Sequence, residues 1–326
     1  MTIAHIAETA GVSVPTVSKV LNGRPGVSDQ TRARVEELID RYGYRKPPAK
    51  GNDILELVFH ELAGMQAVDV IRGVEQVARK HRCGVVISES GPRGAAVDDM
   101  VERRPKAVLA VAHLSEAERG RLKARNIPFV VLDPAVEQPD DVPFVGATDW
   151  RGGQAAIRHL LGLGHRRIAV ICDPDRLAGR ARLAGFQFAM QAAGIPADPA
   201  LVVDAPLTRE GGYEAALSLL ARTDRPTAVF ASNDLQALGV YRAAREAGLR
   251  IPEDLSVVGF DDLPVGAWVD PPLTTVHRPL AEMAAAAAEL ALALGRGEVP
   301  GQLGVEMATT LTVRESTGAP RGVKGD

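Results

Sequence analysis

The stretch that most constrains the fold is Thr2 to Asn22, TIAHIAETAGVSVPTVSKVLN, near the start of the chain. Four of its apolar residues recur at the spacing of one helical face: Ile3, Ile6, Ala7 and Ala10. This spacing predicts a short first helix with one apolar face. Gly11 then supplies the left-handed residue with which helices commonly end. Ser13 is a natural N-cap for a second helix, and Pro15 suits its first turn.

The second predicted helix continues the same apolar face through Val17, Val20 and Leu21. Two short helices around the four-residue turn GVSV form a helix-turn-helix, whose second helix lies in the major groove of DNA. Four residues point away from the apolar face: Val14, Pro15, Ser18 and Lys19. An ordinary helical hairpin has the same pattern, so the DNA-binding interpretation needs support from other parts of the chain.

Two features support DNA binding by this segment. Ser28 is placed to cap a third helix, DQTRARVEELIDRYGY, in which Val35, Leu38 and Ile39 would close a three-helix core. Residues 1–50 contain eight Lys or Arg and five Asp or Glu, whereas the whole chain has 38 and 41. Residues 1–50, called the head below, are therefore basic, whereas the rest of the chain is acidic. This distribution favours a nucleic-acid contact confined to the head.

The amino-acid sequence of the head also resembles that of a known protein family. The segments IAETAGVSVPTVSKVLNG and VSDQTRARVEELIDRYGY resemble the LacI/GalR family of repressors, and the resemblance continues to about residue 316. It implies a dimer on a pseudo-palindromic operator in double-stranded DNA. We expect Val14, Pro15 and Lys19 at base edges and Thr16 and Ser28 on phosphates. The remaining expected DNA contacts are Thr2, Ser13, Ser18, Asn22 and Thr31.

A helix-turn-helix domain over residues 1–46 is followed by a predicted linker over residues 47–53. Pro47 and Pro48 prevent a continuing helix. Most LacI/GalR members have a hinge helix here, whose leucine wedges into the minor groove. This linker has no leucine before Ile54, which favours a shortened spacer over an unorthodox wedge. We therefore expect less kinking of the operator and a greater dependence on phosphate contacts.

With 326 residues, the chain is too long for one hydrophobic core. After Asp53, short apolar runs alternate with helical patterns, which predicts parallel sheets covered by helices on both faces. The predicted strands are residues 54–59, 84–88, 107–112, 129–133, 144–149, 167–173, 201–205, 228–234 and 255–262. The predicted fold is a small all-α helix-turn-helix domain followed by an α/β domain of two Rossmann-like lobes.

The resemblance implies that the α/β domain, residues 54–316, has the periplasmic-binding-protein fold and mediates effector binding and dimerisation. Its first lobe would comprise about 54–148 and 279–305, and its second lobe about 149–278 and 306–316. The chain would cross between the lobes near Thr148–Trp150, His277–Pro279 and Glu306. The tail, residues 317–326, is polar and expected to fray. It has no leucine heptads, so we expect a homodimer without a tetramerising coil.

Polar side chains that follow the predicted strands are the candidates for a ligand site, because ligands bind at the carboxyl ends of parallel strands. The candidates are Glu61, Gln66, Asp133, Asp149, Trp150, Arg176, Arg182, Asn233 and Asp261. Carboxylates, an arginine and a flat aromatic ring are typical of a sugar site.

The resemblance assigns effector contacts to Arg182 in ARLAGF, Asn233 in SNDLQALG and Asp261 in VVGFDD. Leu207 lies where several relatives have a stacking aromatic residue, so Trp150 is the candidate for the ring face. We expect Asp234 and Asp262 to cap helices or brace loops rather than to touch the ligand.

Several function classes lack their sequence signals. The chain shows no charged-then-apolar leader and no apolar run of 18 residues, so we expect a cytoplasmic protein without a membrane segment. The cysteines, Cys83 and Cys172, stand singly in apolar runs and are predicted to be buried thiols. The histidines lack metal-ligand spacing, and neither a phosphate-binding glycine motif nor a nucleophile–base pairing is present. We therefore expect no metal, no cofactor and no enzyme activity.

The sequence thus favours a ligand-responsive repressor of sugar-utilisation genes, released from DNA by a small sugar. A corepressor-type regulator that responds to a purine or another metabolite is the main alternative. A cytoplasmic solute-binding protein or a sugar-processing enzyme with a helical appendage fits less well, because neither explains the basic helix-turn-helix head.

Overall fold

The computed structural model describes residues 3–21, 25–42, 52–60, 62, 64–90, 95–111 and 113–321. The predicted DNA contacts Thr2 and Asn22, the predicted effector contact Glu61 and most of the predicted linker, residues 47–51, lie outside the described residues. The chain divides into two compact units, Met1–Gly51 and Asn52–Asp326. None of the helices within the described ranges has the length and apolar character needed to cross a membrane.

The first unit is a three-helix head, as predicted. Its helices are α1 (Ile3–Ala10), α2 (Val14–Leu21) and α3 (Asp29–Arg41). The apolar positions that recur at helical spacing are buried together: Ile6, Ala7, Ala10, Val17, Val20 and Val35. Leu38 and Ile39 of α3 are partly buried and pack against this core. The hydrophobic face of the head is therefore the one that the periodicity indicates.

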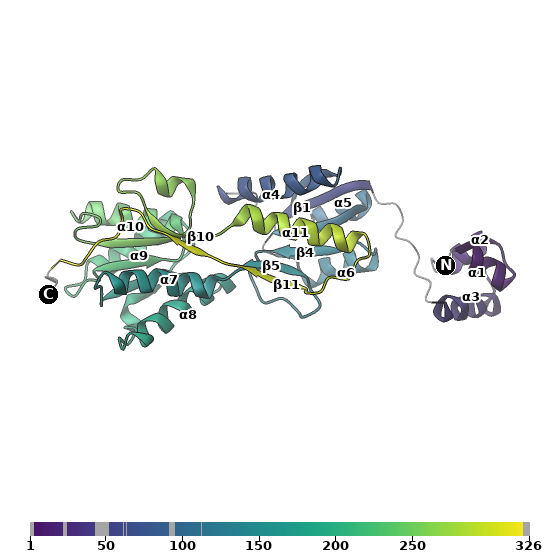
Figure 1. Ribbon diagram of the computed structural model, residues 1–326, viewed down its shortest axis with the longest axis horizontal. Coiled ribbons are helices and arrows are strands. Elements are labelled where there is room, and N and C mark those ends of the chain that lie inside the picture. The colour runs from purple at the N-terminus through teal and green to yellow at the C-terminus, as the bar shows by residue number, and fades with distance from the viewer. Residues whose placement is uncertain are drawn as a thin grey trace. The chain divides into compact units, whose positions relative to one another are not determined.

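The first lobe of the second unit is built on a six-stranded parallel sheet with the order β11-β5-β4-β3-β1-β2. The strands are β1 (Asn52–Phe59), β2 (Gly84–Glu89), β3 (Pro105–Val111), β4 (Phe129–Leu132), β5 (Phe144–Ala147) and β11 (Gly304–Met307). The helices are α4 (Gln66–Lys80), α5 (Ala95–Arg103), α6 (Glu116–Ala124) and α11 (Leu280–Gly295). Figure 1 shows α11 beside α4, although 199 residues lie between the two helices in the chain.

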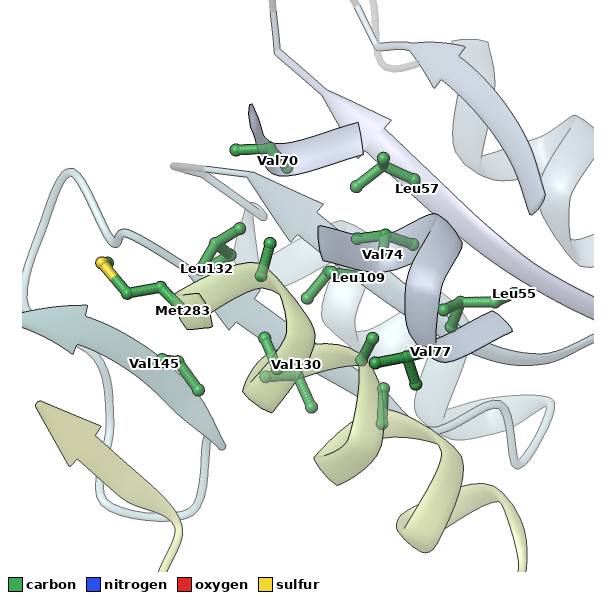
Figure 2. Packing of buried hydrophobic residues seen from close by; sticks show 14 of the residues in the cluster. Leu55, Leu57, Val70, Val74, Val77, Leu109, Val130, Leu132, Val145 and Met283 are labelled. Atoms are coloured by element: carbon green, nitrogen blue, oxygen red, sulfur yellow. The ribbon is translucent and has the colours of Figure 1, made fainter. Parts of the chain in front are cut away.

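Alternate strand residues of this sheet face opposite helical layers. Leu55, Leu57 and Leu109 pack against α4 and α11, where Val74 and Met283 complete the core shown in Figure 2. The neighbouring strand residues Val58, Val108 and Ala110 belong to the core on the α5 and α6 side, with Met100 and Leu122. Burial on both faces explains why these strands appear in the sequence as nearly continuous apolar runs.

The second lobe has the same layered plan, with the strand order β12-β10-β9-β8-β6-β7. Its strands are β6 (Ile168–Cys172), β7 (Val202–Asp204), β8 (Ala228–Ala231), β9 (Ser256–Asp261), β10 (Thr274–His277) and β12 (Thr310–Thr312), which is antiparallel to β10. Its α-helices are α7 (Asp149–Gly162), α8 (Leu177–Ala192), α9 (Arg209–Leu220) and α10 (Asp234–Glu246). Two 3₁₀ turns, Pro199–Leu201 and Pro264–Ala267, are additional.

The two parallel sheets confirm the predicted fold class. Strands β10, β11 and β12 were not predicted, because strands of three or four residues with mixed polarity carry little periodicity. Strand β11 pairs with β5 through Met307, so residues 306 and 307 lie in the first lobe rather than the second. The three crossings between lobes therefore follow β5, β10 and β11.

The segment after β12 is not frayed as far as residue 321, contrary to the sequence-based expectation. The Ser316 hydroxyl donates to the carbonyl of Val257 at 2.6 Å, and Nε2 of the buried His165 lies 2.8 Å from the carbonyl oxygen of Gly318. Arg321 forms an ion pair with Asp254. These contacts come from residues far apart in the sequence, so the local polarity of the tail does not reveal them.

The cysteine prediction holds for one residue only. Cys172 is fully buried in β6, and burial raises the pKa of its thiol to about 12. Cys83 is only partly buried, which corrects the expectation that both are buried. Burial raises the pKa of the Cys83 thiol as well. Both thiols are therefore protonated near neutral pH.

Helices α7 and α8 cross at two glycines, Gly153 and Gly185. A Cβ at Gly185 would lie 2.2 Å from the carbonyl oxygen of Trp150, and a Cβ at Gly153 would lie 2.4 Å from the carbonyl oxygen of Arg182. Both obstructing atoms belong to backbone, which cannot yield as a flexible side chain does. The two helices are therefore in backbone contact at this crossing.

We predict that Gly185→Ala lowers the free energy of unfolding by about 1–3 kcal/mol, because the added methyl group forces α7 and α8 apart. Urea unfolding followed by circular dichroism measures this difference. Gly120→Ala in α6 is the matched control, since its Cβ meets no atom within 4 Å. It should raise stability by up to about 1 kcal/mol. Equal destabilisation by both substitutions would contradict the close crossing.

Candidate functional site

Serine side chains start the second and third helices of the head. The backbone N–H of Thr16 donates to the Ser13 hydroxyl at 3.3 Å, which confirms the predicted N-cap of α2. The N–H of Thr31 donates to Ser28 with the same geometry at the start of α3. Each capping serine also hydrogen-bonds the threonine hydroxyl three residues later, at 2.8 Å. These hydroxyls fix the helix starts, and their contacts with DNA phosphates stay predictions.

The exposed face of α2 carries the predicted base-reading residues. Val17 and Val20 are buried in the core of the head, whereas Val14, Pro15 and Lys19 are exposed. Lys19 supplies the basic side chain of this helix, in its last turn. The helix therefore presents two apolar side chains and one ammonium group in a form that fits a major groove.

Four of the predicted effector residues meet where the two lobes join. Asp133 follows β4, Asp149 begins α7, Arg182 lies in α8, and Asp261 ends β9. The Arg182 guanidinium donates to Asp149 through Nε at 2.8 Å and Nη2 at 2.7 Å, and Nη2 lies 3.6 Å from Asp261. Its third nitrogen donates to the carbonyl of Ser232.

Arg182 is therefore held on several sides. It is 3% exposed, and its guanidinium carbon lies 3.7 Å from the centre of the Phe260 ring. A cation over an aromatic face adds to the ion pairs with Asp149 and Asp261. The arginine that the resemblance assigned to the effector is thus already paired with two carboxylates, and its contact with an effector stays a prediction.

A second buried arginine, Arg278, completes the cluster, and sequence reasoning missed it. Its Nη2 donates to Asp133, and its Nη1 lies 3.4 Å from Asp261. The charges alternate along the chain of contacts Asp133–Arg278–Asp261–Arg182–Asp149. The available signal was an arginine directly after a short strand, in TTVHRPL, at a crossing implied by the resemblance.

The cluster controls the ionisation of its own members. Burial raises the pKa of Asp261, and Arg182 and Arg278 oppose that shift. Burial alone would lower the pKa of Arg278, but Asp133, Asp149 and Asp261 raise it above its usual value. The three aspartates therefore favour the charged form of Arg278, and three carboxyl groups face two guanidinium groups.

A pocket of about 450 Å³ lies beside this cluster, and both lobes line it. Asp133, Phe144 and Glu306 belong to the first lobe, whereas Trp150 and Ala178 belong to the second. Trp150 is 36% exposed, and its ring centre lies 5.1 Å from that of Phe188. The pocket thus combines acceptor carboxylates with an accessible indole, which is the chemistry of a sugar site.

The other predicted effector residues lie outside this cluster, and their contacts with an effector stay predictions. Asn233 is the N-cap of α10: its Oδ1 accepts from Gln236 N at 2.8 Å, and its Nδ2 donates to Leu207 O at 3.0 Å. Arg176 precedes α8, with its Nε 3.5 Å from Asp173. Gln66 begins α4, which packs in the first lobe. Among the residues that the structure describes, no group of three or more His, Cys, Asp or Glu side chains is arranged to hold a metal ion.

Two further carboxylates brace the loop after β9, which is the role expected for them. Asp234 is fully buried, and it accepts from the Thr275 hydroxyl at 2.5 Å and from the Leu263 N–H at 2.7 Å. Asp262 accepts from Arg314 at 2.6 Å. Burial raises the pKa of Asp234 to about 8, and the neighbouring Asp261 charge contributes to the rise.

This shift makes stability depend on pH. Because the folded-state pKa of Asp234 exceeds the unfolded value of 3.8, the folded protein binds more protons between about pH 4 and pH 8. The contribution of Asp234 to the free energy of unfolding therefore falls as the pH rises through that window, by up to about 1.4 kcal/mol per pH unit.

We predict that Asp234→Asn gains stability relative to the wild type as the pH rises from 6 to 9. The amide oxygen accepts from Leu263 N–H, and the amide nitrogen donates to the Thr275 hydroxyl, so both contacts survive. Urea unfolding at several pH values measures the difference. Parallel stability curves for the two proteins would contradict the raised pKa.

Comparison with known proteins places this geometry in a family. Residues 2–46 match the bacterial regulatory proteins of the lacI family, and residues 157–317 match the periplasmic binding protein-like domain. The HTH-type transcriptional regulator MalR of Streptomyces coelicolor is 35% identical over an alignment of 342 positions, which covers 99% of this chain and 98% of that protein.

Two solved structures are similar over nearly the whole chain. The transcriptional regulator CelR–cellobiose complex has a TM-score of 0.75 and 32% identity, and the match covers 97% of this chain and 99% of that one. The lac repressor dimer bound to operator and the anti-inducer ONPF has a TM-score of 0.72 and 26% identity, with 98% and 99% covered. The chain therefore belongs to the LacI family of bacterial transcriptional regulators.

Proposed function

We propose that this regulator is a cytoplasmic repressor of sugar-utilisation genes. As a homodimer it binds a pseudo-palindromic operator through α2, and a neutral mono- or oligosaccharide between the lobes releases it. The observation that carries the proposal is the pocket at the lobe junction, where the accessible Trp150 lies beside Asp133 and Asp149.

The chemistry of this pocket matches a sugar better than an anion. Carboxylate oxygens accept hydrogen bonds from pairs of sugar hydroxyls, and an indole stacks on the apolar face of a pyranose ring. Asp133, Asp149, Glu137 and Glu306 all line the pocket, together with Arg151. A phosphorylated ligand would meet mainly negative charge there. The structurally similar regulator CelR forms a complex with cellobiose, which agrees with a sugar as the ligand class.

The position of the pocket supplies a mechanism for regulation. Because both lobes line it, a bound ligand favours one angle between the lobes over another. In a dimer, a change in this angle alters the spacing of the two heads on the operator. Sugar binding is thereby coupled to the affinity for DNA. Binding of sugar and of operator would then weaken each other by the same factor.

A screen of ligands tests the proposal. Melting temperatures are measured with neutral mono- and disaccharides, including cellobiose, with sugar phosphates and with purines. Operator affinity is then measured with each compound that raises the melting temperature. We expect a neutral sugar to raise it and to weaken operator binding. A screen in which only purines bind, and strengthen operator binding, would replace the proposal with the corepressor alternative.

We predict that Lys19→Ala weakens operator binding by about 1–3 kcal/mol and relaxes discrimination at one position in each half-site. Val14 and Pro15 have no side-chain donors, so Lys19 is the main polar reader of α2. Fluorescence anisotropy with a set of single-base operator variants measures both effects. Arg34→Ala removes an exposed charge from α3 and should leave the base preferences intact. Full affinity and discrimination in the Lys19 variant would refute this placement.

We predict that Asp261→Ala weakens binding of the sugar found in the screen by roughly 2–4 kcal/mol, a hundredfold or more. Calorimetric titration gives the sugar affinity. Asp261→Asn is the gentler second variant, because it keeps the shape beside Arg182 and Arg278. Asp224→Asn, on the exposed surface of the same lobe, is the control. Unchanged sugar affinity in both Asp261 variants would remove this residue from the site.

A further inference from the structure

Arg278 occupies one of the three crossings between the lobes. It directly follows β10, which lies in the sheet of the second lobe. Two residues later α11 begins, and this helix packs on the sheet of the first lobe. The backbone of Arg278 therefore lies in the connection between the two lobes and belongs to neither of them. Its side chain is almost completely buried.

The guanidinium of Arg278 connects carboxylates from both lobes. Nη2 donates to Asp133, which follows β4 of the first lobe, and Nη1 lies 3.4 Å from Asp261, which ends β9 of the second. The remaining nitrogen, Nε, is buried without a hydrogen-bond partner among the described residues. One side chain thus holds both lobes while one of its own donors is unsatisfied. The contacts of Arg278 with the two carboxylates stabilise the junction, whereas the buried Nε–H without a partner costs free energy.

The accessible end of this connection is Asp133. Its side chain is 28% exposed, whereas those of Asp261 and Arg278 are 5% and 3% exposed. Asp133 also lines the 450 Å³ pocket that contains Trp150. A ligand in the pocket therefore reaches the buried charges through Asp133 first.

We propose that the Asp133–Arg278 ion pair is a latch that holds the two lobes at their present angle, and that sugar hydroxyls bound to Asp133 release it. The latch rests on the geometry of the junction alone. Its release by a sugar rests on the proposed function. Arg278 is thus a positioning residue for effector control.

The release follows from competition for one carboxylate. Arg278 donates to Oδ1 of Asp133, and a ligand hydroxyl that donates to the same oxygen weakens or displaces that contact. Loss of one partner leaves the buried guanidinium charge less compensated, which strongly destabilises this arrangement of the lobes. Arg278 then keeps only the 3.4 Å contact with Asp261, so the junction shifts until the guanidinium gains another acceptor. The lobe angle changes as a consequence.

The lobe angle is measured directly, without a ligand. Spin labels are placed on the exposed positions Ala124 in α6 and Glu214 in α9, one in each lobe of the full chain, with Cys83 and Cys172 replaced by serine and alanine. Labelled protein is diluted with unlabelled protein, so that the pulsed electron–electron distance distribution reports one chain. Arg278→Met removes the charge and keeps most of the volume, and Arg278→Lys restores a charge with fewer donors.

Arg103→Met is the matched control. Arg103 pairs with the fully buried Glu56 at 2.6 Å inside the first lobe, so its loss removes a buried ion pair that does not join the lobes. We expect Arg278→Met and Asp133→Asn to shift or broaden the distance distribution, and the double variant to add nothing further. Arg278→Lys should recover part of the wild-type distribution. Arg103→Met should leave the distance unchanged.

A distribution in Arg278→Met that matches the wild type would overturn the latch. For the release, operator affinity is measured with the neutral sugar that raises the wild-type melting temperature most. We expect at least a tenfold weakening in the wild type and less than threefold in Arg278→Met at saturating sugar. Equal weakening in both would overturn release through Arg278. If the distance shifts but the wild type responds to no sugar, the proposed function fails while the latch stands.

Discussion

The second unit depends on the pairing of five charges at the junction of its two lobes. Asp133, Arg278, Asp261, Arg182 and Asp149 come from different elements, and four of the five are almost completely buried. A charge removed from water is stable only with a partner of opposite sign and a full set of hydrogen bonds. The ends of β4, β9 and β10 and the starts of α7 and α11 are therefore fixed relative to one another. The shape of the pocket beside Trp150 depends on this pairing of charges.

Much of the fold could be predicted because its signals are local. The faces of α1 and α2, and the serine caps Ser13 and Ser28, each depend on residues within one or two turns. The parallel strands are buried on both faces, so their apolar runs were visible without knowledge of their neighbours. Strand β10 was missed because Thr274 and Thr275 are polar yet fully buried, with partners that come from distant segments. The attachment of the tail through Ser316 was missed for the same reason.

The candidate site was predictable only in part. The rule that ligands bind at the carboxyl ends of strands places Asp133, Asp149 and Asp261 at the correct edge. It does not say which carboxylates are already paired, because pairing depends on the distances between elements. Arg182 thus turned out to be held by Asp149, and Asn233 caps α10. Arg278 lies after a strand too short to stand out, so its part in the cluster became visible only once the sheets were assembled.

The charge balance of the junction also limits what the regulator can sense. Three carboxyl groups and two guanidinium groups meet at the junction, and two further acidic residues, Glu137 and Glu306, line the adjoining pocket. An anionic ligand would add a like charge in a region of low dielectric constant, where repulsion is strong. A neutral ligand rich in hydroxyls avoids that repulsion and supplies donors to carboxylates that have spare lone pairs. In the proposed latch the same donors would compete with Arg278 for Asp133, so that one carboxylate would both recognise the ligand and transmit its presence to the lobes.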